Sequence, residues 1–130
     1  MAEFIASLLL LFQIEMGHAA YYSEGRMEQT VVIRQAGWTA YPLPRELPPV
    51  HDFIATDDCG EVGRQVWLFR PGQGFSRALI ADCCNELAGD CDRMRGRGII
   101  AEIGHNTAVR WGALGLGPED IDIAIIRSRQ

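Results

Sequence analysis

The stretch Arg64-Gln-Val-Trp-Leu-Phe-Arg70, Pro71-Gly-Gln-Gly74, Phe75-Ser-Arg-Ala-Leu-Ile-Ala-Asp82 decides the fold class of this chain. Polar and apolar residues alternate over the first part, which is typical of a half-buried strand. The Pro-Gly-Gln-Gly segment is typical of a turn, and the apolar run after it predicts the second arm of a hairpin. The middle of the chain is therefore predicted to be an antiparallel hairpin that ends at Asp82.

Short apolar runs on both sides of this hairpin predict a mainly β domain. Helical spacing of apolar residues predicts one short helix over 106–114, which Gly115 ends. About six short strands with one or two helical turns indicate a small closed or partly closed β-barrel. Besides the two arms of the hairpin, strands are expected over residues 30–34, 52–56, 98–103 and 121–126.

The composition is that of one globular domain. The chain has 130 residues, of which 48% are hydrophobic and 22% charged, and these values argue against intrinsic disorder. The net charge is −5. Nucleic acid is therefore not an expected partner, because binding to phosphates requires a basic face.

The N-terminus carries an apolar run over residues 4–14 that points to an export signal. The run is too short for a stable membrane span, which needs about 20 residues, but it fits the apolar region of a secretory signal peptide. Small residues follow at 17–20, where a peptidase would cut. Acidic residues flank the run and no basic residue precedes it, so the alternative is a buried helix. Residues 1–19 are assigned to this signal or helix, and 20–130 to the barrel.

The four cysteines are Cys59, Cys83, Cys84 and Cys91. An even number in a small exported chain suggests disulfides, and four cysteines allow three pairings. No Cys-x-x-Cys pair is present, so the spacings fit neither a zinc site nor a redox dithiol, and no metal or cofactor is expected. The hairpin brings Cys59 and Cys83 to one end. We therefore predict a Cys59–Cys83 bridge, with Cys84–Cys91 as the second.

Four local motifs occur in the order of a known barrel family. They are Ala20-Tyr-Tyr-Ser23; Ile54-Ala-Thr-Asp57 with Val62-Gly-Arg-Gln-Val-Trp67; Ala78-Leu-Ile-Ala-Asp82; and Gly98-Ile-Ile-Ala-Glu102-Ile-Gly104 with Ala108-Val-Arg-Trp-Gly112. Together they resemble rare-lipoprotein-A-like domains and the three-aspartate domain of membrane-bound lytic transglycosylases. The resemblance implies a six-stranded double-psi β-barrel, the fold shared with barwin, expansins and endoglucanase-V-type cellulases.

The resemblance also implies glycan chemistry, with Asp82 at the position of the family's catalytic aspartate. Cleavage of a glycosidic bond needs a carboxylic acid that protonates the leaving oxygen. Asp82 ends an apolar strand, where burial favours the protonated acid. Asp57 stands where the family carries a histidine, and it is the expected second carboxylate of an inverting hydrolase. A lytic transglycosylase works with one carboxylate, because the sugar's own hydroxyl closes on the anomeric carbon.

Other side chains are candidates for substrate binding. Trp38, between a glycine and a Pro-rich loop, is the expected platform for a sugar ring, and Glu28 or Glu24 is the candidate for an acidic residue near the start of the family's domain. The basic run Arg93-Met-Arg-Gly-Arg97 is a candidate contact for glycan carboxylates.

Two functions are consistent with these features. The first is an extracellular or periplasmic enzyme that cleaves a polysaccharide, peptidoglycan above all, with Asp82 as general acid. The second is a non-catalytic barrel that binds a glycan or forms a structural part of an extracellular or surface assembly. The missing histidine favours the second, and the retained Asp82 favours the first.

Overall fold

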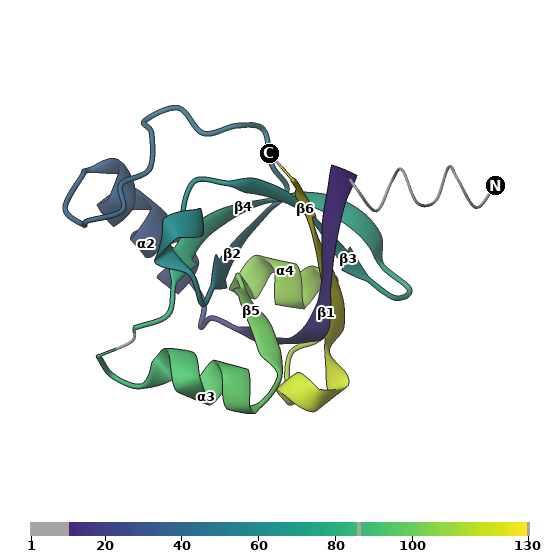
Figure 1. Cartoon of the computed structure of the whole chain (residues 1–130). Helices are drawn as coiled ribbons and strands as arrows, with labels where there is room; N and C mark the ends of the chain where they lie inside the picture. Colours follow the sequence, from purple (N-terminus) through teal and green to yellow (C-terminus); the bar gives the residue numbers. More distant parts are fainter. Residues whose placement is uncertain (1–10, 86, 130) are drawn as a thin grey trace.

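The computed structural model describes residues 11–85 and 87–129 and shows a closed barrel of six strands (Figure 1). The expected mainly β barrel is therefore confirmed. The strands are β1 (Phe12–Tyr21), β2 (Asp52–Thr56), β3 (Gln65–Arg70), β4 (Gly74–Cys83), β5 (Ile99–Ile103) and β6 (Asp122–Ser128). The helices are α2 (Arg26–Gln35), α3 (Asp90–Gly96) and α4 (His105–Arg110), with 3-10 turns η1 (Cys59–Glu61) and η2 (Pro118–Asp120).

The strand order around the barrel is β1-β5-β2-β4-β3-β6, and β6 closes onto β1. β1 pairs with β5, and β2 with β4, in parallel. All other pairs are antiparallel. Only β3 and β4 form the expected hairpin, so the remaining neighbours meet through crossovers. In this arrangement the last residues of β2 lie between the last residues of β4 and those of β5.

The barrel interior is filled by the alternating apolar residues of the strands. On β3, Val66 and Leu68 point into the core, whereas Trp67 lies on the outside and is 41% exposed. Trp111, just after α4, is buried in the same cluster, so it serves packing and not a ligand. Two smaller clusters lie outside the barrel wall, one under α2 and one under α3.

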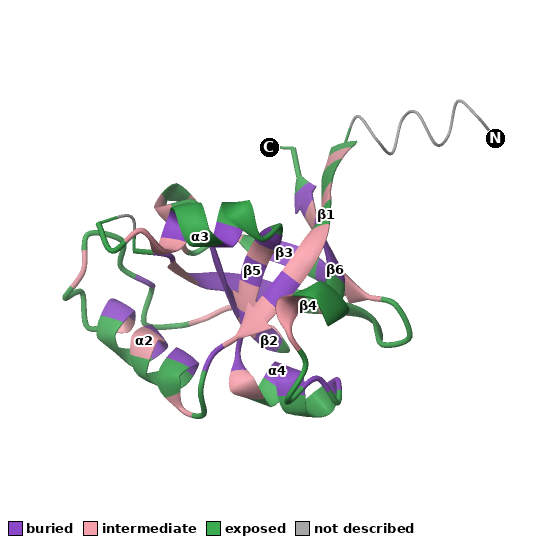
Figure 2. Ribbon diagram, turned by 90° about the horizontal axis from the view of Figure 1, so that it is seen from below, coloured by how far each residue is buried: buried purple, intermediate pink, exposed green. Residues whose placement is uncertain are grey.

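Residues 30–34 were expected to form a strand, but they lie in α2, so that prediction is wrong. The β-branched run Val31-Val-Ile33 favours a strand by intrinsic propensity. Tertiary packing overrides this preference, because Met27, Val31 and Arg34 are buried at helical spacing against the barrel. Figure 2 shows the resulting stripe of buried residues along α2.

The barrel begins earlier in the chain than expected. Residues 12–19, which were assigned to the signal peptide or N-terminal helix, belong to β1. β1 pairs with both β5 and β6, so a cut at 17–20 would remove most of a strand that closes the barrel. The rest of the apolar run, residues 4–10, lies outside the described residues.

Helices α2 and α3 lie on the same side of the barrel in both views (Figures 1 and 2). α2 packs against β4, and α3 packs against β5. The outer ends of β4, β2 and β5 are therefore flanked by two helices, and this is where the polar side chains described below gather.

Candidate functional site

Asp82 and Glu102 stand in one row across the outside of the barrel. Ala55 on β2 is paired with Asp82 on β4 and with Glu102 on β5. A register shift between Ile54 and Ala55 leaves one extra β4 residue just before Asp82, and such bulges re-aim side chains. Two strand spacings separate Asp82 from Glu102, which corresponds to about 10 Å between Cα atoms.

The carboxylate of Asp82 accepts a hydrogen bond at each oxygen. The Tyr22 hydroxyl donates to Oδ2 at 2.6 Å, and the Arg34 guanidinium donates to Oδ1 at 2.6 Å. The Asp82 side chain is 15% exposed. In this arrangement both carboxylate oxygens of Asp82 are engaged by donors from the protein.

Arg34 reaches Asp82 because α2 places it on the buried face of the helix. The helix begins after Gly25, whose φ of 79° lies in the region that glycine adopts without strain. The guanidinium of Arg34 also donates to the backbone oxygen of Tyr41 at 2.9 Å and to Thr39 Oγ1 at 3.2 Å. The arginine therefore ties the loop after α2 to the end of β4.

Glu102 is half-buried and lines a cavity of about 240 Å³ between α2 and α3. Burial raises the pKa of Glu102 above its ordinary value, and the negative charges of Asp82 and Asp90 act in the same direction. The positive charges of Arg26 and Arg93 oppose this shift. Glu102 is thus a carboxyl group with a raised pKa at the wall of a cavity that opens to solvent.

Tyr22 is hydrogen-bonded to Asp82 and lies within the electrostatic influence of Glu102. Burial raises the pKa of the Tyr22 hydroxyl, and the hydrogen bond to Asp82 and the charges of Asp82 and Glu102 raise it further. The hydroxyl therefore keeps its proton. The Arg26 guanidinium lies 5.0 Å from the centre of the Tyr22 ring, which places a cation beside the site.

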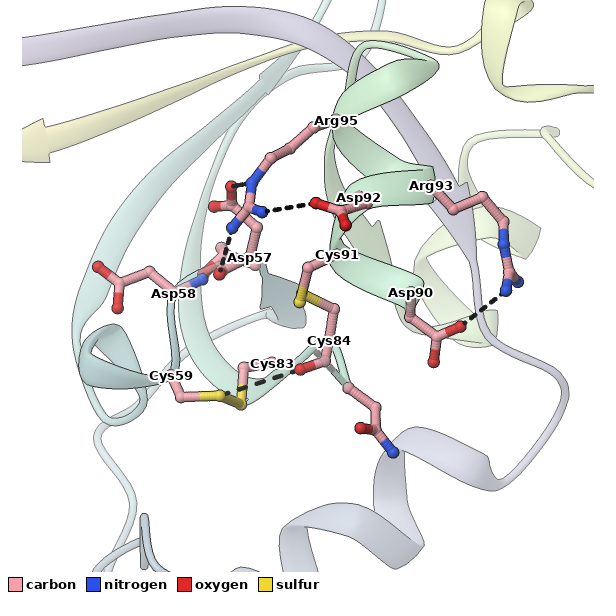
Figure 3. The surroundings of a disulfide bond; sticks show 12 residues. Asp57, Asp58, Cys59, Cys83, Cys84, Asp90, Cys91, Asp92, Arg93 and Arg95 are labelled. Carbon is pink, nitrogen blue, oxygen red and sulfur yellow. Dashed lines mark hydrogen bonds and ion pairs between the residues drawn. A yellow bond between two sulfur atoms is a disulfide. The ribbon is translucent and has the colours of Figure 1, made fainter. Parts of the chain in front are cut away.

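Asp57, the expected partner of Asp82, is held by a different arginine. Arg95 Nε on α3 lies 2.8 Å from Asp57 Oδ2, and a second nitrogen of Arg95 lies 3.4 Å from Asp92 (Figure 3). Asp57 also lines another cavity, of about 620 Å³, beside Cys59. The carboxylate that shares the row with Asp82 is Glu102.

Both predicted disulfides are present. Cys59 is bonded to Cys83 and Cys84 to Cys91, with Cα separations of 5.0 Å and 5.2 Å. These distances lie within the range of disulfides in proteins. The first bridge fixes η1 to the last residue of β4, and the second fixes α3 to the residue that follows β4 (Figure 3). Together they hold α3 next to the row of carboxyl groups.

The expected substrate-binding residues lie apart from one another. Trp38 is 79% exposed in the loop after α2, and the same loop carries Tyr41, which lines the cavity at Asp57. Glu28, on the first turn of α2, accepts a hydrogen bond from Asn106 of α4 at 3.3 Å. Glu28 therefore joins two helices and is not among the contacts of Asp82.

Tyr22, Arg34 and Glu102 were not among the site residues predicted from the sequence. Tyr22 and Glu102 fall inside two of the motifs that carry the resemblance. Arg34 was missed because residues 30–34 were expected to form a strand, whereas they lie in α2. Helical spacing of Met27, Val31 and Arg34 was the signal that could have found it.

No group of three or more His, Cys, Asp or Glu side chains within residues 11–85 and 87–129 could hold a metal ion. In the same residues, none of the helices has the length and apolar character needed to cross a membrane. Comparison of the chain with protein-family models, curated proteins and solved structures gives no match.

Proposed function

We propose that this barrel cleaves a polysaccharide and that Glu102 is the carboxylic acid that protonates the leaving glycosidic oxygen. The observation that carries the proposal is the placement of Glu102, half-buried at the wall of an open cavity and in register with Asp82. Enzymes raise the pKa of such an acid by burial and by a neighbouring charge. Asp82 supplies the neighbouring negative charge.

Asp82 acts in this proposal as a positioning residue and not as the acid that the resemblance implies. Its oxygens are occupied by Tyr22 and Arg34. Its charge favours the proton on Glu102, and its hydrogen bond holds Tyr22. Cleavage with one acid fits a transglycosylase-type reaction, in which the proton of Glu102 passes to the leaving oxygen and a hydroxyl of the same sugar closes on the anomeric carbon. That hydroxyl then passes its own proton to the carboxylate of Glu102, which restores the acid.

The two disulfides indicate an oxidising compartment. We place the activity outside the cell or in the periplasm for this reason. Peptidoglycan is the first substrate to test, because the motifs around Tyr22, Asp82 and Glu102 resemble those of peptidoglycan-cleaving barrels.

A non-catalytic glycan-binding or structural barrel is the second candidate. The observation that favours it is that Asp82 and Asp57 each form an ion pair with an arginine, which is the arrangement of charged groups with a structural role. In that case the protein would bind glycans without releasing fragments.

The test is release of soluble fragments from peptidoglycan and from neutral and acidic polysaccharides, by the native protein and by Glu102→Gln. We expect fragments from at least one glycan, and a loss of about 10²–10⁴-fold in rate for Glu102→Gln. Mass spectrometry separates closure by the sugar's own hydroxyl from hydrolysis, because hydrolysis adds one water to the fragments. Full activity of Glu102→Gln would refute the assignment, and binding without cleavage would support the second candidate.

A further inference from the structure

The cavity beside Glu102 is rich in arginine, although the chain as a whole is acidic. Its wall carries Arg26 of α2, Arg93 of α3 and Arg97 just after α3. Two acidic residues, Asp90 and Glu102, complete the charged part of the wall. The whole chain has a net charge of −5, but this cavity wall carries more arginines than acidic residues.

Arg93 and Arg97 form only weak, exposed ion pairs. Arg93 forms an ion pair with Asp90 at 3.2 Å, and Arg97 forms one with Glu119 at 3.6 Å. At least 40% of every side chain in these pairs is exposed. Exposed pairs contribute little to stability, so both arginines can turn to a ligand at small cost.

Arg26 is the arginine best placed for a ligand. Within the described part of the chain, no carboxylate lies at ion-pair distance from its guanidinium. Its guanidinium stands over the Tyr22 ring, 5.0 Å from the ring centre, and its charge is close enough to Glu102 to lower the pKa of that acid. A planar guanidinium in this position suits a carboxylate, which it can bind through two parallel hydrogen bonds.

We propose that this cavity is a subsite for a carboxylate-bearing sugar and that the substrate is therefore an acidic polysaccharide. The proposal rests on cleavage at Glu102 for its place in the reaction, but the binding itself requires only the arginines. The cavity of about 240 Å³ is smaller than sites for drug-sized ligands, which start at about 300 Å³, so it suits one substituted sugar. The carboxylate comes either from a uronic acid or from the lactyl and peptide groups of peptidoglycan.

The bound carboxylate would also assist the acid. Neutralisation of Arg26 by the ligand removes one of the charges that lower the pKa of Glu102. Glu102 would then hold its proton more firmly when the charged substrate is in place. The subsite thus couples recognition of the acidic sugar to the protonation of the group that reacts.

Binding tests the subsite separately from cleavage. The soluble probe is an oligogalacturonide, compared by calorimetry with the same oligosaccharide after reduction of its carboxyl groups to alcohols. The second probe is peptidoglycan, compared by co-sedimentation with peptidoglycan whose carboxyl groups are converted to amides. We expect one charged form to bind at least about tenfold more tightly than its uncharged counterpart, which is a common worth of a hydrogen bond between charged groups. The probe that shows this preference identifies the source of the carboxylate, a uronic acid or peptidoglycan.

The variant Arg26→Gln should remove most of this preference, whereas Arg45→Gln, on an exposed loop and outside the cavity wall, should keep it. Equal binding of charged and uncharged forms, binding of neither, or equal loss in both variants would overturn the subsite. A preference that depends on Arg26 without release of fragments leaves the subsite standing and refutes cleavage. Cleavage through Glu102 that is as fast on neutral as on acidic glycans would refute the subsite and leave cleavage standing.

Discussion

The protonation of Glu102 depends on single charges around it, and this gives a prediction in two directions. The charge of Asp82 raises the pKa of Glu102, and the charge of Arg26 lowers it. Asp82→Asn should therefore lower the pKa of Glu102 and move the alkaline limb of the pH–rate profile, where the acid loses its proton, to lower pH. Arg26→Gln should move the same limb to higher pH.

The measurement is kcat/KM against pH on whichever glycan is cleaved. Tyr22, Asp90 and Arg93 also face Glu102, and they are unchanged in both variants, so opposite shifts report the charges of Asp82 and Arg26. Shifts in the same direction would contradict the assignment of Glu102 as the acid.

The ion pair between Arg34 and Asp82 is buried enough to matter for stability. The two side chains are 9% and 15% exposed. Removal of one partner leaves the other charge without compensation, so Arg34→Met and Asp82→Asn should each destabilise the fold, Arg34→Met by about 3 kcal/mol. The double variant should lose about 1–3 kcal/mol less than the sum of the two. Urea denaturation of all four proteins measures this, and strict additivity would show that the pair does not couple.

Single residues were only partly predictable from the sequence. Asp82 was identified because it ends an apolar strand and because the motifs mark it. Its donors come from segments 48 and 60 residues away in sequence, and no local pattern reports such contacts. The placement of Asp82 and Glu102 on either side of Ala55 depends on a register shift between β2 and β4, which the sequence does not display.

At the level of elements, the strands with alternating residues were predictable and the packed helix was not. β3 alternates between exposed and buried residues from Gln65 to Leu68, as its sequence predicts. β4 has four consecutive buried residues, Ala78 to Ala81, which agrees with the apolar run in its sequence. α2 contains four β-branched residues in succession, Thr30 to Ile33, and only its packing on β4 selects the helix. The Cys59–Cys83 bridge was predictable because the hairpin brings its two cysteines to one end, and Cys84 and Cys91 then remain as the second pair.

The two disulfides should contribute unequally to stability. The Cys59–Cys83 bridge spans 24 residues and the Cys84–Cys91 bridge spans 7. By loop-closure entropy, loss of the first should cost about 3.5 kcal/mol and loss of the second about 2.5 kcal/mol. Paired Cys→Ala variants of each bridge, compared by chemical denaturation, measure the difference. A larger loss from the short bridge would indicate that packing of α3, and not chain entropy, dominates.

For the whole molecule, closure of the barrel depends on β1. β1 pairs along its length with β6 and at its end with β5, and Leu11 accepts a hydrogen bond from Arg129 at 2.9 Å. A chain that begins at Leu11 keeps every one of these contacts. A chain that begins at Ala20, where a signal peptidase cut was expected, loses most of them.

We therefore expect the chain from Leu11 to unfold cooperatively and the chain from Ala20 to lack a cooperative transition. Circular dichroism during thermal unfolding distinguishes the two. A cooperative transition in the chain from Ala20, at a temperature close to that of the longer chain, would show that the barrel closes without β1.

We propose above all that Glu102 donates the proton to the leaving oxygen. The most direct test compares kcat/KM of the native protein and Glu102→Gln on the cleaved glycan and on a dinitrophenyl glycoside of the same sugar, whose leaving group departs without a proton. We predict a loss of about 10²–10⁴-fold on the glycan and less than about tenfold on the dinitrophenyl glycoside. An equal loss on both substrates, or no loss on the glycan, would contradict the claim.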